Sequence, residues 1–325
     1  MRIIITACLA CSIMHAQVLR PILFGGSGLP QAATPTFSPS SGAPPQTVTI
    51  SASSGGVICY NTSGSPATNG TTGCTTGTLY TGTVSVSTPE TLYAVSGGTG
   101  YKDSAVGSAA YTSLGATSNN AQCYYESSNP AHCSLPSTPT VGHTVLVGVY
   151  IPGSYTASSF TDNQSPPNTY TLVSSITGVN STNALYIYAG YVATASGTFT
   201  VDFTLSTSFN PTYISVGEYT GLSNPVNVDK VATGVYNSAG NSCNPTATGT
   251  TSNANDLIYS FIRYNSASTI TADTGYTIPT NGKSVVTGSI QVGSEYQVVS
   301  STGSYTPGYT LGASGGAYCA GAAIY

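Results

Sequence analysis

The sequence predicts an all-β protein, and two observations carry this prediction. Short segments alternate polar and apolar residues with a period of two, as in Thr47–Ile50, Thr83–Val86 and Thr91–Val95. Gly, Pro, Ser and Asn separate these segments, which is typical of strands joined by turns. No segment has the periodicity of an amphipathic helix. We therefore expect β-sandwiches, a small one followed by a larger, jelly-roll-like one.

The composition excludes two classes of protein. Charged residues make up only 5 % of the 325 residues, the net charge is −4, and no basic run exists that could neutralise phosphates. Nucleic-acid binding is therefore not expected. Hydrophobic residues reach 40 % and include 24 Tyr, enough to fill sizeable cores, so the chain is not expected to be disordered.

The first 16 residues have the order of a secretory signal peptide. Met1-Arg2 is followed by the apolar stretch Ile3–Met14 and by Ala16, after which we expect cleavage. This stretch is shorter than the roughly 20 residues needed to span a bilayer, and no longer apolar segment follows. A buried N-terminal element and a lipoprotein signal ending at Cys8 are the alternatives. We expect a secreted protein, extracellular or at the cell surface, with no membrane span, in which residues 17–33 form a lead.

The six cysteines that would remain after cleavage are expected to form three disulfides. An even number in an exported chain favours bridges. Local loop closure pairs Cys59 with Cys74 and Cys123 with Cys133, and elimination pairs Cys243 with Cys319. The alternative is a metal site that uses Cys123, His132, Cys133 and His143, but the close Cys or His pairs of zinc sites are missing.

We therefore expect neither a metal nor a cofactor. One metal site still has to be tested. Asp162 and Asp273 lie in predicted loops at corresponding positions of the two halves of residues 114–325, and either could bind Ca²⁺.

Residues 34–113 carry a resemblance to a known family. The blocks that carry it, in order, are Pro35–Gly42, Thr47–Ile50, Ile58–Pro66, Leu79–Gly82, Glu90–Val95 and Gly100–Thr112. This segment resembles the chitobiase/β-hexosaminidase C-terminal-type domain. The resemblance implies a small immunoglobulin-like β-sandwich, an accessory module of exported bacterial proteins without catalytic residues. Ser63-Gly64 departs from the Asp-Gly turn usual in that family, so a role for that acidic side chain is in doubt.

Residues 114–325 contain a faint internal repeat. Val145–Tyr150 is echoed by Leu257–Ile262, and Tyr170–Leu172 by Tyr276–Ile278. Two half-domains could pack as the two sheets of one sandwich, or two small sandwiches could follow one another. No linker separates the halves, so we expect one jelly-roll-like domain. Coincidence in a Tyr- and Thr-rich sequence is the third possibility. This part resembles β-rich domains of secreted bacterial proteins to which no function attaches.

No complete catalytic set is evident. Gly312–Gly316 fits a Gly-x-Ser-x-Gly elbow, but no helix can follow it as that motif requires. Asp162, Asp202, Glu218 and Asp229 could supply an acid pair for glycoside hydrolysis. We expect a non-enzymatic protein, with glycoside hydrolase or esterase activity as the lesser alternative.

Sugar binding on an aromatic surface is the leading functional hypothesis. In Leu185–Ala189, alternation places Tyr186 and Tyr188 on the face opposite Leu185 and Ile187, so the two rings would stand in solvent as a platform. The other candidate tyrosines lie in predicted loops: Tyr124, Tyr125 and Tyr155. The alternative is that these tyrosines simply cover a sheet face.

The sequence therefore predicts an adhesion or polysaccharide-binding protein whose partner is a polysaccharide or another cell-surface polymer. The runner-up is a self-assembling extracellular structural subunit, because few lysines protect the strand edges.

Overall fold

The protein consists of strands and loops. The computed structural model describes residues 28–126, 129–153, 157–180, 182–206 and 211–325. The regular secondary structure in these residues consists of β-strands. The predicted all-β class is confirmed. Among these residues no helix of the length and apolar character needed to cross a bilayer exists. The expected signal peptide, residues 1–16, lies outside the described residues.

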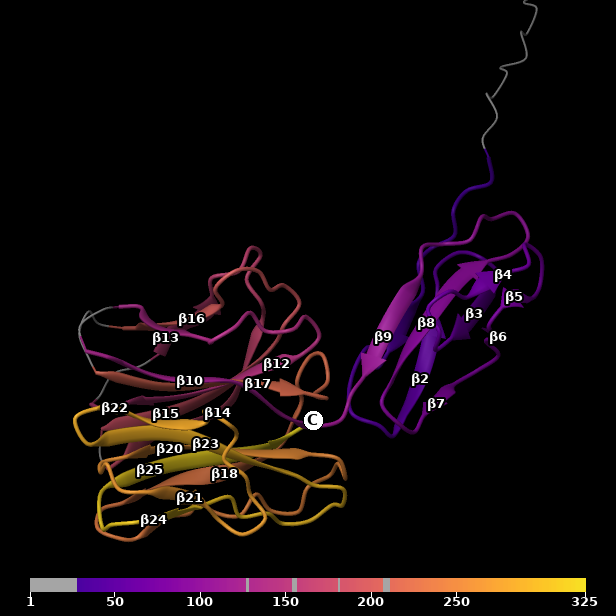
Figure 1. Cartoon of the computed structure of the whole chain (residues 1–325). Helices are drawn as coiled ribbons and strands as arrows, with labels where there is room; N and C mark the ends of the chain where they lie inside the picture. The colour runs from indigo at the N-terminus through magenta and orange to yellow at the C-terminus, as the bar shows by residue number, and fades with distance from the viewer. Residues whose placement is uncertain (1–27, 127–128, 154–156, 181, 207–210) are drawn as a thin grey trace, which may run out of the picture.

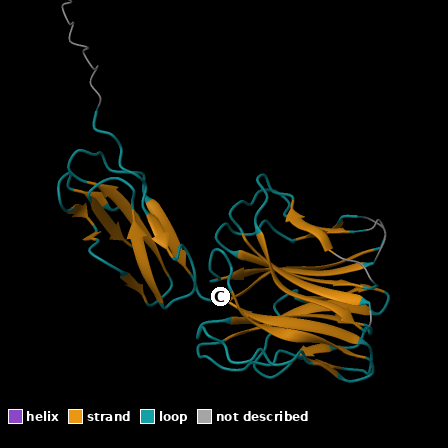
Figure 2. Cartoon of the chain, turned by 180° about the vertical axis from the view of Figure 1, so that it is seen from behind, coloured by secondary structure: helices purple, strands orange, loops and turns teal. Residues whose placement is uncertain are grey.

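The chain forms a small part and a large part that meet at one end of the large part (Figures 1 and 2). The small part has a three-stranded sheet in the order β1-β2-β7, a four-stranded sheet in the order β6-β3-β8-β9, and the pair β4-β5. Val48, Ile50 and Val86 from the first sheet pack with Leu92 and Ala94 from the second. The strands are β1 (Thr36–Ser38), β2 (Gln46–Ser51), β3 (Val57–Asn61), β4 (Ala67–Thr68), β5 (Cys74–Thr76), β6 (Thr78–Leu79), β7 (Val84–Val86), β8 (Glu90–Gly97) and β9 (Gly107–Tyr111).

The large part contains two halves with the same strand order. The first half has a five-stranded sheet, β10-β17-β12-β15-β14, and a three-stranded sheet, β11-β16-β13. The second half has the sheets β18-β25-β20-β23-β22 and β19-β24-β21, so each strand has a counterpart eight strands later.

The strands of the first half are β10 (Gly115–Tyr125), β11 (Ala131–Ser134), β12 (Thr144–Ile151), β13 (Ala157–Asp162), β14 (Tyr170–Val179), β15 (Asn183–Tyr191), β16 (Thr200–Leu205) and β17 (Thr212–Thr220). Those of the second half are β18 (Val228–Asn237), β19 (Ser242–Cys243), β20 (Leu257–Tyr264), β21 (Ile270–Ala272), β22 (Lys283–Thr287), β23 (Ile290–Val298), β24 (Tyr309–Leu311) and β25 (Ala317–Ile324).

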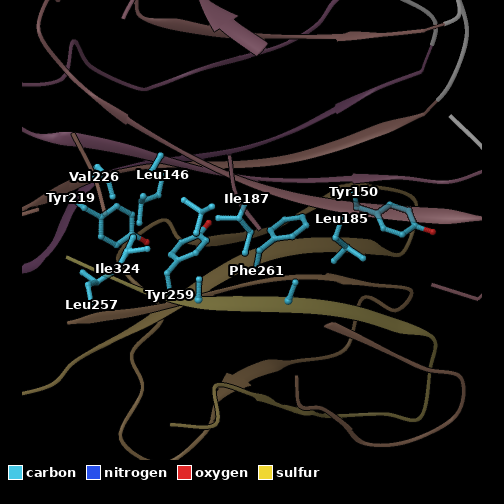
Figure 3. Close-up of a cluster of buried hydrophobic side chains, with 14 of the residues drawn as sticks. Leu146, Tyr150, Leu185, Ile187, Tyr219, Val226, Leu257, Tyr259, Phe261 and Ile324 are labelled. Carbon is cyan, nitrogen blue, oxygen red and sulfur yellow. The ribbon is translucent and has the colours of Figure 1, made fainter. Parts of the chain in front are cut away.

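The two five-stranded sheets pack face to face around what we call the interlayer core. Leu146 and Ile187 of the first half meet Tyr259 and Phe261 of the second half there (Figure 3). Gly148 makes the close contact possible, because a Cβ at that position would lie 2.2 Å from the Phe261 ring. The large part is therefore built around this shared core.

Each five-stranded sheet is buried on its outer face as well. In β12, Leu146 and Tyr150 point into the interlayer core, while Val145, Val147 and Val149 pack against the three-stranded sheet of the same half. The large part consequently has four sheets, which differs from the expected single jelly-roll-like sandwich of two. The physical reason is that both faces of these strands are apolar, so each face needs a covering layer.

The three disulfides join the pairs that the sequence predicts: Cys59–Cys74, Cys123–Cys133 and Cys243–Cys319. Cys133 and Cys243 lie on the counterpart strands β11 and β19. Their partners lie on different strands of the large sheets, β10 and β25. In the first half the bridge ends at Cys123 on β10, which pairs with Ile214 on β17. In the second half it ends at Cys319 on β25, the counterpart of β17, which pairs with Val235 on β18. The attachment point therefore differs by one strand between the halves.

The connection between the two parts is fixed at Gly221. The Thr220 hydroxyl donates a hydrogen bond to the Ser113 carbonyl at 2.7 Å. Gly221 has φ +78°, and a Cβ there would lie 2.6 Å from the Thr112 carbonyl oxygen. Only glycine satisfies both conditions without strain.

We predict that Gly221→Ala lowers the free energy of unfolding by about 2–5 kcal/mol, because it adds left-handed strain of about 1–2 kcal/mol to overpacking of about 1–3 kcal/mol. Urea denaturation measures the change. Gly249→Ala is the matched control, since Gly249 has φ +75° and a Cβ there would have no heavy atom within 4 Å. Equal losses in the two variants would contradict the close contact with the connection.

Candidate binding site: an arginine among tyrosines

Two rows of side chains face each other at one end of the interlayer core. In the first half, ladder pairing sets Tyr124, Tyr213 and Tyr150 side by side on β10, β17 and β12. In the second half it sets Tyr236, Tyr318 and Arg263 side by side on β18, β25 and β20. We call these six residues the arginine–tyrosine cluster.

The rings of the cluster are in contact within each row and between rows. The centroids of Tyr124 and Tyr213 are 5.0 Å apart, and those of Tyr236 and Tyr318 are 4.4 Å apart. Tyr150 and Tyr318, which come from opposite sheets, are 4.7 Å apart. These distances are typical of favourable aromatic pairs, so the cluster fastens the two halves together.

The cluster lies where the interlayer core meets solvent. Tyr150, Tyr213 and Tyr318 are 3, 5 and 6 % exposed, whereas Tyr124 and Tyr236 are only partly buried. Tyr150 lies at the end of the core opposite Ile324 (Figure 3). Ile324 immediately precedes the C-terminal residue, and the C-terminus lies near the small part (Figure 1). The buried rings therefore support two rings that remain partly accessible.

Arg263 is held by ring faces. Its guanidinium carbon lies 5.0 Å from the ring centroids of Tyr150 and Tyr213 and 5.9 Å from that of Tyr318. These are cation–π distances. Burial raises the pKa of Tyr150 above its usual value, and the neighbouring Arg263 charge offsets part of that rise. The Tyr150 hydroxyl therefore stays protonated at neutral pH.

The predicted platform of Tyr186 and Tyr188 does not form. Tyr186 is only 6 % exposed, and Tyr188 stacks on Phe160 with their centroids 4.4 Å apart. Leu185 and Ile187 are buried too, in the interlayer core. The alternation is as predicted, but the three-stranded sheet covers the tyrosine face, so both faces of the strand are buried.

The other three candidate tyrosines have separate outcomes. Tyr124 belongs to the arginine–tyrosine cluster, on a strand rather than in a loop. Tyr125 points to the opposite side of β10, where its ring lies edge-on to His132. Tyr155 lies outside the described residues.

Sequence reasoning missed Arg263, Tyr150, Tyr213, Tyr236 and Tyr318. One signal was present, since Arg263 is the only arginine of the residues that the structure describes.

The opposite end of the interlayer core, near the small part, holds polar pairs. His143 precedes β12 and Asp256 precedes β20 at corresponding places. His143 Nδ1 lies 2.6 Å from Glu218 Oε1, which also accepts a hydrogen bond from the Thr140 N–H. Burial alone would raise the pKa of Glu218, but hydrogen bonds from His143, Thr140 and Asn119 hold it below its usual value.

The Asp256 carboxyl is buried beside a second carboxyl. Asp256 is 0 % exposed, and burial together with the Asp229 charge raises its pKa to about 7. Asp229 accepts hydrogen bonds from the N–H groups of Ser252 and Asn253 and lies 3.6 Å from the Lys230 ammonium. Asp229 is therefore the ionised member of the pair, and Asp256 is protonated below about pH 7.

Glu295 is a third buried acid, in the second half. It is 0 % exposed, and burial raises its pKa to about 9. One oxygen, Oε1, accepts the Gly308 N–H at 2.7 Å, while Oε2 has no hydrogen-bond partner. Glu295 is therefore neutral at physiological pH.

The residues considered for catalysis are engaged elsewhere. Asp202 lies 2.5 Å from His132 Nδ1. The Ser314 hydroxyl of the Gly-x-Ser-x-Gly segment donates to the Ala239 carbonyl. Within the described chain, no serine is hydrogen-bonded to a histidine.

The residues considered for metals are engaged as well. Cys123 and Cys133 are bonded to each other. Asp162 accepts hydrogen bonds from Gln164, Asn168 and Tyr170, which occupy the oxygens that Ca²⁺ would need. Asp273 accepts the Thr310 hydroxyl. The described residues contain no group of three or more His, Cys, Asp or Glu side chains placed to hold a metal ion.

We predict that stability falls as the pH rises from about 4 to 9. Asp256 and Glu295 have folded-state pKa values of about 7 and about 9, above their ordinary values, so the stability they contribute is complete at low pH and is lost as pH rises. Each group contributes a slope of about 1.4 kcal/mol per pH unit between its two pKa values. Thermal unfolding across this range measures it.

Glu295→Gln should remove the slope above pH 7, and Asp256→Asn should reduce it below pH 7. Glu218 and Asp229, whose pKa values are lowered, act only at more acidic pH. A wild-type protein equally stable at pH 5 and pH 9 would contradict the burial of two neutral acids.

Comparison of this chain with protein-family models, with curated proteins and with solved structures finds no match in any of the three.

Proposed function

We propose that this is a secreted, non-catalytic protein that binds polysaccharide at the arginine–tyrosine cluster and acts in adhesion to a cell surface or matrix polymer. The observation that carries the proposal is the placement of Tyr124 and Tyr236. Both rings are partly exposed, and both rest on buried rings of the same cluster. A pyranose ring presents an apolar face that stacks on such an aromatic surface.

Polar groups beside the rings support the proposal. The Asn183 amide donates to the Tyr318 hydroxyl at 2.9 Å, and the tyrosine hydroxyls are both donors and acceptors for sugar hydroxyls. Three disulfides are compatible with an extracellular setting. The small part serves as an accessory module that spaces the large part from its neighbours, in keeping with the chitobiase-type resemblance of its sequence.

Self-assembly into an extracellular structural layer is the second candidate. Three exposed apolar side chains favour it: Leu172, Val231 and Val285 are 46, 42 and 49 % exposed. They lie on β14, β18 and β22, which are edge strands of the five-stranded sheets. Exposed edges with apolar side chains are sites of strand pairing between molecules.

We predict that Tyr124→Ala and Tyr236→Ala each weaken polysaccharide binding by about 1–3 kcal/mol, because each removes a stacking ring. A pull-down on a panel of insoluble polysaccharides identifies a ligand, and titration calorimetry with its soluble oligosaccharide measures the change. Tyr101→Ala, in the small part, is the control and should bind as the wild type does. Unchanged affinity in both cluster variants would place the sugar site elsewhere.

Light scattering on the same samples separates the two candidates. A monomer that binds polysaccharide supports adhesion. Large assemblies that bind no sugar, and that dissociate when Leu172 is changed to Lys, would favour the structural subunit.

A further inference from the structure

We infer that the polysaccharide recognised at the arginine–tyrosine cluster is acidic, and that Arg263 binds the carboxylate of a uronic-acid residue. The inference rests on the proposed function and names the class of its ligand. Four observations carry it: the place of Arg263 in the two rows, its missing partner, the free edge of its guanidinium group, and the charge around it.

Arg263 stands where the first half has a tyrosine. Ladder pairing places Tyr150 beside Tyr213 and Arg263 beside Tyr318, on the counterpart strands β12 and β20. Tyr124 and Tyr236 complete the two rows. A tyrosine in place of Arg263 would complete the row with the same kind of side chain as the other five residues of the cluster. Packing of the cluster therefore does not by itself require a positive charge at this position.

The Arg263 charge has no carboxylate partner. None of the ion pairs among the described residues includes it, and its Nε is buried without a hydrogen-bond partner. A guanidinium removed from water without an acceptor lowers stability unless something compensates for it. The ring faces of Tyr150 and Tyr213 supply part of that compensation. The buried Nε–H still lacks an acceptor.

Arg263 is partly exposed, and no ion pair among the described residues includes its terminal nitrogens. Of the guanidinium nitrogens, only Nε is both shut off from solvent and unpartnered. Ring faces attract the cation but accept none of the directed N–H bonds that lie in its plane. Two parallel N–H donors in a fixed fork match the two oxygens of a carboxylate.

The charge around Arg263 opposes a general attraction for anions. The chain carries a net charge of −4, and burial, Tyr213 and the nearby Glu126 charge together raise the pKa of the Tyr124 hydroxyl. A polyanion is therefore repelled by the molecule as a whole and by Glu126. Preference for an acidic ligand has to come from Arg263 itself, while the sugar ring that carries the carboxylate stacks on Tyr124 or Tyr236.

The test compares oligogalacturonate with its fully methyl-esterified form, which keeps the sugar rings and removes the charge. We expect the wild type to bind the acid about tenfold or more tightly than the ester. Arg263→Gln and Arg263→Tyr should bind both forms with the weaker affinity of the ester. Arg263→Lys, which keeps the charge but loses the fork, should fall between. Thermal unfolding of each variant reports any structural role separately.

The outcomes separate this inference from the proposed function. Equal binding of acid and ester by the wild type overturns the inference and leaves polysaccharide binding standing. Binding of neither form, nor of any neutral polysaccharide, overturns both. Tighter binding of dextran sulfate than of oligogalacturonate overturns the carboxylate in favour of a sulfate ester. The wild-type comparison needs no variant, so it decides the matter even if Arg263 variants fail to fold.

Discussion

Burial of both faces of two five-stranded sheets is the constraint on which the large part depends. The interlayer core covers one face of each sheet, and a three-stranded sheet covers the other. Strands with no solvent-facing side read as nearly continuous apolar runs, as β12 does and as β20 does apart from Ser260 and Arg263. The low content of charged residues is consistent with so many side chains lying between layers.

Face-to-face packing of the two five-stranded sheets leaves the interlayer core with two ends, and different residues cover each end. Near the small part, Leu114 and Leu222 pack against the core beside the connection held at Gly221. At the other end, a closing side chain needs an apolar body and a polar tip that can reach water, which tyrosine and arginine both provide. The tyrosines of the arginine–tyrosine cluster therefore meet a structural requirement, and the cluster also carries a partly exposed cation, Arg263.

The sequence predicts the strands and two of the disulfides because they depend on local information, and elimination then leaves Cys243 and Cys319 as the third pair. Alternation locates Leu185–Ala189 as a strand, but it says only that its two faces differ, so the sheet that covers Tyr186 and Tyr188 could not be foreseen. Arg263 was missed for a related reason. The internal repeat read from the sequence aligns Val145 with Leu257, whereas the ladders align Thr144 with Leu257, a shift of one residue. In the alignment given by the ladders, Arg263 corresponds to Tyr150. The exchange of a tyrosine for an arginine between the two halves then becomes visible in the sequence.

Both halves bury polar side chains, but two polar exchanges on counterpart strands distinguish the second half from the first. Its ladder pair Ser260–Glu295 occupies the place of Val147–Tyr188 in the first half, and Arg263 occupies that of Tyr150. Each exchange lowers stability, since a buried acid must stay protonated and a partly buried guanidinium lacks an acceptor. The two exchanges face different layers: Glu295 lies toward Gly308 of its own half, whereas Arg263 lies against Tyr150 and Tyr213 of the first half. The only cation of the cluster is therefore a residue of the second half that rests on rings supplied by the first half.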